Sequence, residues 1–264
     1  MSMDASSLHI VQITDCHLGA TPGTTLLNMD TDASLAAVID LIRRQRRACD
    51  LLLATGDLSD HGSVAAYRRL REHTQGFGAA RWLPGNHDNA ITLRETLAGD
   101  ERALRVFRSQ HWQVVMLDSS VPLQVGGYLA ASELQALLAC LRESPLHTVI
   151  AVHHPVVDVG CAWLDQQQVA NADAFWALVG QFPQVKVVLC GHVHQPLDVL
   201  HQGVRVLCTP STAWQFAANS ADYRVDNLTP GYRWLQLHAD GRIDTGVERI
   251  DAGLFQPDVL STGY

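Results

Sequence analysis

Positive charge is scarce in this sequence. It contains 19 Lys and Arg residues against 27 Asp and Glu residues, which gives a formal net charge of −8. A protein that binds a long nucleic acid needs an excess of positive charge to neutralise the phosphates, so we expect no nucleic-acid partner. A small anionic substrate remains compatible with this charge if bound metal ions supply positive charge locally.

Long apolar runs and closely spaced cysteines are absent too. No run approaches the roughly 18 residues that a membrane span requires, and the polar N-terminus lacks the basic and apolar segments of a signal peptide. The six cysteines form no C-x-x-C pair, and several stand in apolar runs, where a free cysteine behaves as a small buried hydrophobe. We therefore expect a cytoplasmic protein with no membrane partner and no disulfide scaffold.

Neither an internal repeat nor a Pro-, Gly- or Ser-rich linker divides the 264 residues. Short runs of Val, Ile and Leu alternate with helical patterns, which predicts an α/β fold whose strands are covered on both faces. We expect a single domain over 1–264, with a C-terminal tail from about residue 250. The expected strands span 8–14, 51–55, 81–83, 113–117, 148–152, 186–190, 204–209, 232–237 and 243–249.

Apolar residues recur at helical spacing in three segments. These segments cover 35–42, cover 134–141 and begin near Asn171. Ser132 and Gln135 match a capping box at the start of the second helix. The basic run 43–47 follows the first helix. Because cations complement the negative end of the helix dipole, we interpret this run as a helix end rather than as a nucleic-acid patch.

Five of the expected strands lead into residues that can bind a metal ion. The motifs are Asp15-Cys16-His17, Gly56-Asp57, Gly85-Asn86-His87-Asp88, His153-His154-Pro155 and Gly191-His192-Val193-His194. Ligands bind outside the carboxyl ends of strands in open α/β sheets. Each motif alone also fits a turn or a core histidine, but all five in this order indicate one shared site.

We expect this site to hold two metal ions. The donor atoms are carboxylate oxygens, an amide oxygen and imidazole nitrogens, from Asp15, His17, Asp57, Asn86, His153, His192 and His194. A carboxylate can bridge two ions, and mixed nitrogen and oxygen ligands without a thiolate suit manganese, iron, cobalt or zinc better than calcium or magnesium. Two such ions about 3.5–4 Å apart can hold an acidified bridging water and stabilise an in-line displacement at phosphorus.

Two side-chain directions follow from extended strand geometry. His192 and His194 are two residues apart, so in an extended segment they face the same way. Cys16 stands between Asp15 and His17, so its side chain points to the opposite face, and we do not assign it as a ligand.

The motif order D-x-H, G-D, G-N-H-D, H, G-H-x-H resembles that of the calcineurin-like metallophosphoesterases. Further segments resemble the bacterial 3′,5′-cyclic AMP phosphodiesterases of that superfamily, so that the likeness covers nearly the whole chain. These segments are 12–15, 54–57, 82–88, 161–165, 210–212 with 215–216, 230–232 and 255–258. One departure is Val156, which follows Pro155 where many members have a second proline. It leaves the metal motifs untouched.

The resemblance implies a fold and a role for each motif residue. The fold is a sandwich of two mixed β-sheets flanked by helices. The metals are two divalent transition ions, iron or manganese first and zinc or cobalt as alternatives. First-metal ligands are Asp15, His17 and His194, the bridge is Asp57, and second-metal ligands are Asn86, His153 and His192, with His154 in reserve. His87 resembles a catalytic histidine that is not a ligand, and Asp88 would orient it.

The implied activity is hydrolysis of 3′,5′-cyclic AMP to 5′-AMP, with a metal-activated hydroxide attacking phosphorus opposite the 3′ oxygen. An alternative is a hydrolase for another small phosphodiester, such as another cyclic nucleotide or a glycerophosphodiester. A scaffold that has lost catalysis is disfavoured, because all seven ligand positions are filled. Asn86, His87 and His194 would meet the phosphate. Trp163 and Phe216 are candidates for stacking on the purine or, alternatively, core aromatics. Monomer and homodimer both remain open.

Overall fold

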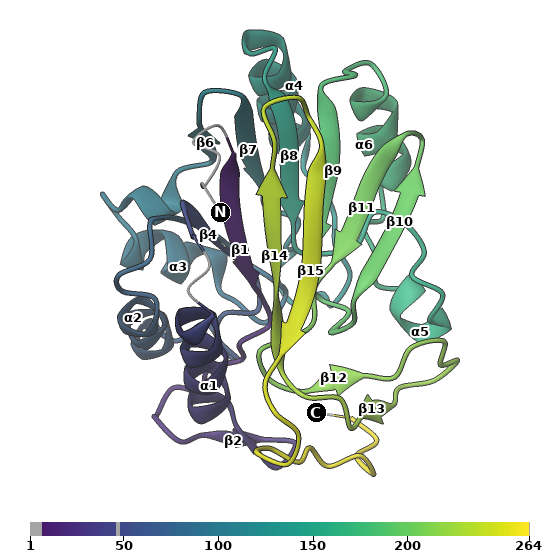
Figure 1. Cartoon of the computed structure of the whole chain (residues 1–264). Helices are drawn as coiled ribbons and strands as arrows, with labels where there is room; N and C mark the ends of the chain where they lie inside the picture. The colour runs from purple at the N-terminus through teal and green to yellow at the C-terminus, as the bar shows by residue number, and fades with distance from the viewer. Residues whose placement is uncertain (1–6, 46–47, 264) are drawn as a thin grey trace.

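The computed structural model describes residues 7–45 and 48–263. Two β-sheets pack face to face, and helices cover both outer faces (Figure 1). This α/β sandwich of two mixed sheets flanked by helices confirms the predicted fold. Arg46 and Arg47 of the basic run lie outside the described residues.

The first sheet has the strand order β15-β14-β1-β4-β5. β1, β4 and β5 are parallel, whereas β14 is antiparallel to both β1 and β15. The strands span Leu8–Ile13 (β1), Leu51–Thr55 (β4), Ala79–Leu83 (β5), Gly231–Leu237 (β14) and Ile243–Arg249 (β15). The carboxyl ends of β1, β4 and β5 therefore meet at one edge.

The second sheet has the order β10-β11-β9-β8-β7-β6, with four parallel strands between two antiparallel edge strands. The strands span Val106–Arg108 (β6), Trp112–Leu117 (β7), His147–Val152 (β8), Val185–Cys190 (β9), Leu197–His201 (β10) and Val204–Cys208 (β11). Short hairpins join β2 (Thr25–Leu26) to β3 (Met29–Asp30) and β12 (Gln215–Phe216) to β13 (Val225–Asp226).

Helices on each side bury the outer faces. α1 (Thr31–Arg44), α2 (Val64–His73) and α3 (Ala90–Thr96) pack on the first sheet, and α4 (Ala131–Glu143) and α6 (Ala172–Val179) pack on the second. Two short turns, η1 (Glu101–Ala103) and α5 (Ala162–Asp165), complete the described helices. None of the helices in the described ranges is long and apolar enough to cross a membrane.

β4 shows why these strands are continuous apolar runs in the sequence. Leu51 and Leu53 point into the layer between the two sheets, and Leu52 and Ala54 point toward the helices. Successive strand residues face opposite sides, so a strand covered on both sides has no polar face to alternate with.

The structure also contains elements that the sequence pattern does not predict. α2 buries only Ala66, Tyr67 and Leu70, so its apolar stripe is narrow and interrupted by arginines. β10 is an edge strand whose middle residues are exposed, which removes the apolar signal of a covered strand. The predicted capping box is wrong, because α4 begins after Ala130 and Ser132 lies inside the helix.

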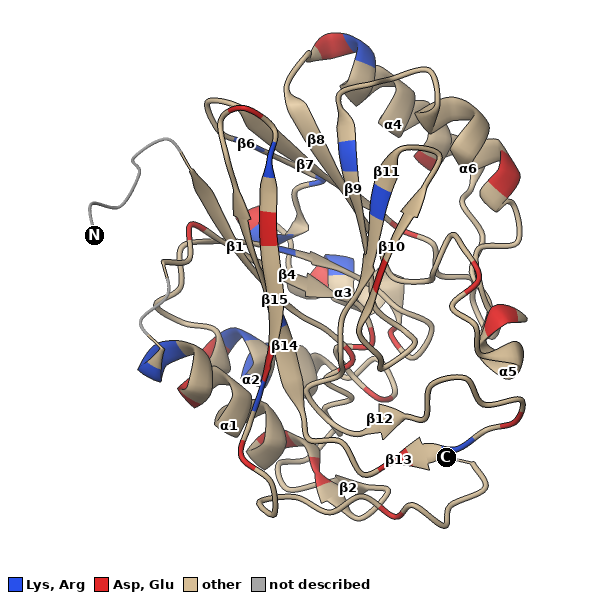
Figure 2. Cartoon of the chain, turned by 45° about the vertical axis from the view of Figure 1, so that its right-hand side comes forward, with Lys and Arg blue, Asp and Glu red and all other residues tan. Residues whose placement is uncertain are grey.

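After Ile250 the described chain forms no further helix or strand. It returns to the β2–β3 hairpin, where the Asp258 N–H donates to the Leu27 carbonyl at 2.9 Å. Figure 2 shows acidic residues in the loops between the lower ends of the two sheets, which is where the predicted ligands lie.

Candidate metal centre

The seven predicted ligands lie together at the carboxyl edge of both sheets. Asp15 and His17 follow β1, Asp57 follows β4, Asn86 follows β5, His153 follows β8, and His192 and His194 follow β9. Asn86 is partly exposed, and the other six side chains are buried. The structure therefore brings together residues that are up to 179 positions apart in the sequence.

Main-chain hydrogen bonds and glycines hold the strand ends close together. The Asp15 N–H donates to the Gly56 carbonyl at 2.9 Å, and the Gly191 N–H donates to the His153 carbonyl at 2.9 Å. A Cβ atom on Gly85 would lie only 2.2 Å from Oδ1 of Asp57. The glycines of these motifs are thus needed because any side chain would push the loops apart.

Most of the predicted ligands have left-handed backbone conformations. The φ angles are 53° for Asp15, 46° for His17, 49° for Asp57, 64° for His192 and 48° for His194. Such a conformation costs a non-glycine residue on the order of 1–3 kcal/mol, and it clusters at functional sites. His192 and His194 are therefore not in an extended segment, and the prediction that they face the same way is wrong.

Asp15, His17 and His194 form what we call the first half-site. Nε2 of His17 lies 3.3 Å from Nε2 of His194, and Oδ1 of Asp15 lies 3.4 Å from the same His194 atom. All three side chains are at most 1% exposed. The three donor atoms thus converge on one enclosed point.

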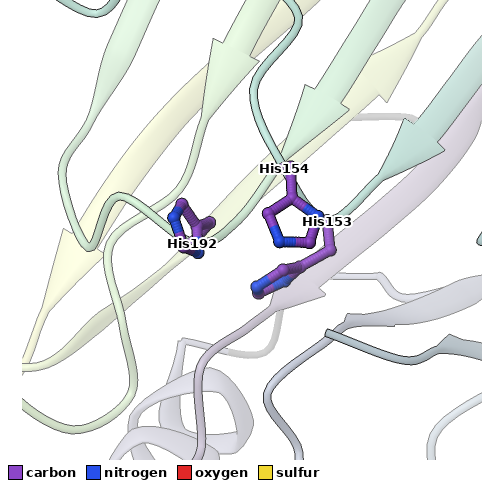
Figure 3. A group of neighbouring side chains, drawn as sticks. All are labelled: His153, His154 and His192. Atoms are coloured by element: carbon purple, nitrogen blue, oxygen red, sulfur yellow. The ribbon is translucent and has the colours of Figure 1, made fainter. Parts of the chain in front are cut away.

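Asn86, His153 and His192 form the second half-site. Oδ1 of Asn86 lies 3.2 Å from Nε2 of His153 and 3.0 Å from Nδ1 of His192. Figure 3 shows the side chains of His153 and His192 close together at the ends of neighbouring strands, with His154 beside them. The ring centroids of His153 and His192 are 5.3 Å apart.

Asp57 lies between the two half-sites. Its Oδ2 is 3.8 Å from Nε2 of His17 and 3.3 Å from Nε2 of His153. Burial by itself would raise the pKa of the Asp57 carboxyl, but the neighbouring histidines, His153 above all, hold it well below its usual value. A carboxylate that stays ionised between two sets of nitrogen donors is suited to bridge two cations.

Hydrogen bonds on the outer side of two imidazoles leave a lone pair pointing inward. The Nδ1 atom of His153 lies 2.8 Å from the Thr55 carbonyl, and that of His194 lies 2.8 Å from the Trp214 carbonyl. A carbonyl can only accept, so Nδ1 carries the proton and Nε2 is a free acceptor in the neutral ring. Inward-facing acceptors of this kind are satisfied by a cation, and the donor set fits two divalent ions.

His154 lies close to this cluster but is directed away from it. One of its nitrogens comes within 4.8 Å of nitrogens of His153 and His192. However, its Nε2 lies 3.0 Å from the Val125 carbonyl, and its Nδ1 lies 2.8 Å from Oγ of Ser119. Because burial lowers the pKa of His154 to about 3, the ring is neutral and both nitrogens are occupied. The geometry therefore favours His153 as the ligand.

His87 lies beside the donor cluster. Its backbone N–H donates to Oδ1 of Asp57 at 2.8 Å, and its ring Nδ1 lies 3.4 Å from Oδ1 of Asp60. Burial would lower the pKa of His87, but the hydrogen bond with the Asp60 side chain and the negative charge of Asp57 raise this pKa to about 9. A protonated imidazole at this position can donate a proton to a leaving group or a hydrogen bond to a phosphate oxygen.

Asp88 does not occupy the place that the sequence predicts for it. Its carboxylate accepts four hydrogen bonds of 2.9–3.0 Å, from the backbone N–H groups of Leu58, Ser59 and Gly85 and from the Tyr67 hydroxyl. It thereby fixes the two turns that follow β4 and β5. The carboxylate beside the His87 ring belongs to Asp60, so the expected pairing of Asp88 with His87 is corrected.

Phe216 does not line a rim either. It is 3% exposed, and its ring stacks on His194 with centroids 4.4 Å apart and an interplanar angle of 24°. Trp163 packs edge-on against Phe216 at 5.0 Å and is partly buried. The structure therefore places Phe216 in the core that supports His194, and the proposed stacking of a base on Phe216 is corrected because its face is covered.

Two residues of the site carry no prediction from the sequence. Asp60 lies 3.9 Å from Nδ1 of His17 and beside His87, and the only available signal is a second aspartate three residues after Asp57. Gln167 places its Oε1 3.0 Å from Nε2 of His192. No sequence signal separates Gln167 from Gln166 and Gln168, because only the fold shows which of the three reaches the site.

Comparison with known proteins agrees with this geometry. The calcineurin-like phosphoesterase family matches residues 8–196. The chain is 41% identical to the 3′,5′-cyclic adenosine monophosphate phosphodiesterase CpdA of Vibrio vulnificus (strain CMCP6), covering 100% of this chain and 97% of that protein. It is 42% identical to the protein of the same name from Escherichia coli (strain K12), covering 97% and 95%.

Solved structures show the same fold at low sequence identity. A dimetal phosphatase from Danio rerio superposes with a TM-score of 0.60 at 14% identity, over 92% of this chain and 99% of that one. A purple acid phosphatase from yellow lupin gives 0.60 at 11% identity, over 98% and 56%. The chain belongs to the calcineurin-like phosphoesterase family.

Proposed function

We propose that the chain hydrolyses 3′,5′-cyclic AMP to 5′-AMP. The observation that carries this proposal is the convergence of seven nitrogen and oxygen donors from five strand ends, in a chain about 40% identical over its whole length to two proteins named for this activity. Phosphodiester hydrolysis fits the donor set, and the choice of cyclic AMP rests on the relatives.

The residues of the site have different proposed roles. Asp15, His17 and His194 would hold one divalent ion, Asn86, His153 and His192 would hold a second, and Asp57 would be shared by both. When bound, two such ions lower the pKa of water to supply a nucleophile near neutral pH, and they neutralise the phosphate. His87 lines the cavity with Asn86, its 22% exposed side chain packs edge-on against His17 at 4.8 Å, and it would meet the leaving 3′ oxygen or a phosphate oxygen there. Asp60 orients it.

A cavity beside the second half-site supports a substrate with an organic group attached to the phosphate. It has a volume of about 390 Å³, and Asn86 and His87 line it. Val121, Pro122 and Leu123 also line it, and we call these three residues its apolar wall. The volume lies in the range of small-molecule sites, about 300–1,000 Å³. The apolar wall favours contact with an organic group, such as a nucleoside, over contact with water.

Four further proposals complete this function. The ions are iron or manganese, with zinc or cobalt as alternatives, in keeping with the mixed nitrogen and oxygen ligands. The chain acts as a single domain over 1–264. It works in the cytoplasm, with a small molecule as its partner rather than a nucleic acid or a membrane. Trp163 is retained as a weaker candidate for base contact, since it is only partly buried.

A product assay on a panel of phosphoesters tests the proposal. The panel contains 3′,5′-cyclic AMP, 3′,5′-cyclic GMP, 2′,3′-cyclic AMP and a glycerophosphodiester, each with Mn²⁺ or Fe²⁺. We expect the highest kcat/KM for 3′,5′-cyclic AMP and 5′-AMP as the sole product. A higher kcat/KM for the glycerophosphodiester would contradict the proposed substrate, and release of 3′-AMP would contradict the proposed leaving oxygen.

A further inference from the structure

Each histidine of the metal centre has one ring nitrogen facing inward and another that needs an outer partner. That partner selects the tautomer and fixes the orientation of the ring. In His153 and His194 the partner is a main-chain carbonyl, and His17 faces Asp60. His192 differs, because its Nε2 lies 3.0 Å from the side-chain oxygen of Gln167, which belongs to none of the strand-end motifs.

The main chain around Gln167 is held in place by hydrogen bonds on both sides. The Gln167 N–H donates to the Leu164 carbonyl at 2.8 Å, and the Val169 N–H donates to the Pro155 carbonyl at 2.9 Å. Pro155 directly follows His153-His154. The segment between α5 and α6 is thus tied to the end of β8, so the Gln167 side chain has a defined position relative to the second half-site.

The contact with Gln167 decides which His192 nitrogen faces inward. An amide oxygen can only accept, so the Nε2 atom of a neutral His192 ring carries the proton and Nδ1 carries the lone pair. Nδ1 lies 3.0 Å from Oδ1 of Asn86, which is also an acceptor. His192 is 5% exposed, so water has little access to separate the two acceptors. A cation that binds both atoms satisfies them.

We propose that Gln167 is a positioning residue for the second half-site: it accepts the Nε2–H of His192 and holds Nδ1 toward the second ion. The inference rests on the proposed function only in assuming that two divalent ions bind. It does not depend on cyclic AMP as the substrate. The consequence is that the affinity for the second ion depends on a residue that contacts no ion.

A Mn²⁺ titration of the metal-stripped chain tests this proposal, with two binding constants resolved. Gln167→Met keeps the side-chain length and removes the acceptor, and it should weaken the second site by about 10–100-fold while leaving the first unchanged. Gln167→Glu keeps an acceptor and should retain tight second-site binding. Gln166→Met is the matched control, since Gln166 is an exposed neighbour, and it should bind as the wild type does.

Each other outcome has a definite meaning. Unchanged second-site affinity in Gln167→Met overturns the proposal and leaves the proposed function intact. An equal loss at both sites, with a lower unfolding temperature of the stripped chain, shows a packing role and also overturns it. Loss in Gln167→Glu as large as in Gln167→Met shows that the amide donates rather than accepts, which contradicts the tautomer. A wild-type chain that binds fewer than two ions overturns the proposed function itself.

Discussion

The first half-site lies wholly within the protein core, whereas the second reaches a cleft through Asn86. His194 stacks on Phe216, and His17 packs against Trp214 with ring centroids 4.6 Å apart. Asn86, in contrast, is partly exposed and lines a cavity with His87. The difference predicts unequal roles: the first half-site would anchor one ion within the fold, and the second would present the other ion to the substrate.

The largest effect should come from removing the carboxylate that lies between the two half-sites. Asp57→Ala should lose at least one ion and nearly all phosphodiesterase activity, because two cations would then face each other without the bridging carboxylate. Metal analysis and a cyclic AMP assay check both parts. Asp50→Ala, a change at an exposed aspartate, is the control and should behave as the wild type. Full metal content with near-normal turnover in Asp57→Ala would refute the bridge.

The next largest effect should come from His87, on the cleft side. His87→Ala should keep both ions and lower kcat by roughly 10²–10⁴, the usual contribution of one acid–base group. The loss should shrink for a nitrophenyl phosphodiester, because its phenol leaves without a proton. His111→Ala is the control, since His111 lies between β6 and β7, at the edge opposite the site. An equal loss for both substrates would show that His87 binds the phosphate and is not the acid.

A substitution in the core that supports the first half-site should lower the stability of the protein as well as its turnover. Phe216→Ala removes a buried ring from beneath His194, and it should lower the free energy of unfolding by about 3–5 kcal/mol. First-site metal affinity should fall with it, as measured by denaturant unfolding and Mn²⁺ titration. A variant of normal stability with a raised KM for cyclic AMP would show instead that Phe216 contacts the base.

The smallest effect should come from the apolar wall of the cavity. Leu123 is fully exposed, so Leu123→Ala should leave stability unchanged. It should raise KM for cyclic AMP by about tenfold, since about 1.4 kcal/mol of apolar contact is lost. A phosphodiester without a base should be unaffected. Leu200→Ala, at an exposed leucine of β10, is the control. An unchanged KM in Leu123→Ala would place the nucleoside elsewhere.

The same comparison explains how much the sequence could predict. The candidate ligands could be located because each lies a few residues beyond the end of a buried strand, and a parallel strand fixes where its end lies. Phe216 could not be assigned, because an aromatic residue has the same signal in a core as at a rim. Asp60 and Gln167 could not be found either, because their contacts arise only when segments distant in the sequence pack together.

The backbone conformation of the motif turns also could not be predicted from the sequence. The left-handed turns at His192 and His194 send the two side chains to different half-sites, whereas strand alternation predicts that they face the same way. Likewise, the sequence shows Asp88 next to His87 but gives no sign that Asp60 reaches the His87 ring. Only the hydrogen bonds of Asp88 to the turns after β4 and β5 separate their roles.

The measurement that tests the central claim most directly is the metal content of the purified chain, by mass spectrometry, beside that of one variant from the open half-site. We predict two ions per wild-type chain and one per Asn86→Ala chain, with the unfolding temperature of the metal-stripped variant equal to that of the stripped wild type. One ion in the wild type, or two tightly held ions in Asn86→Ala, would contradict a centre built from two unequal halves.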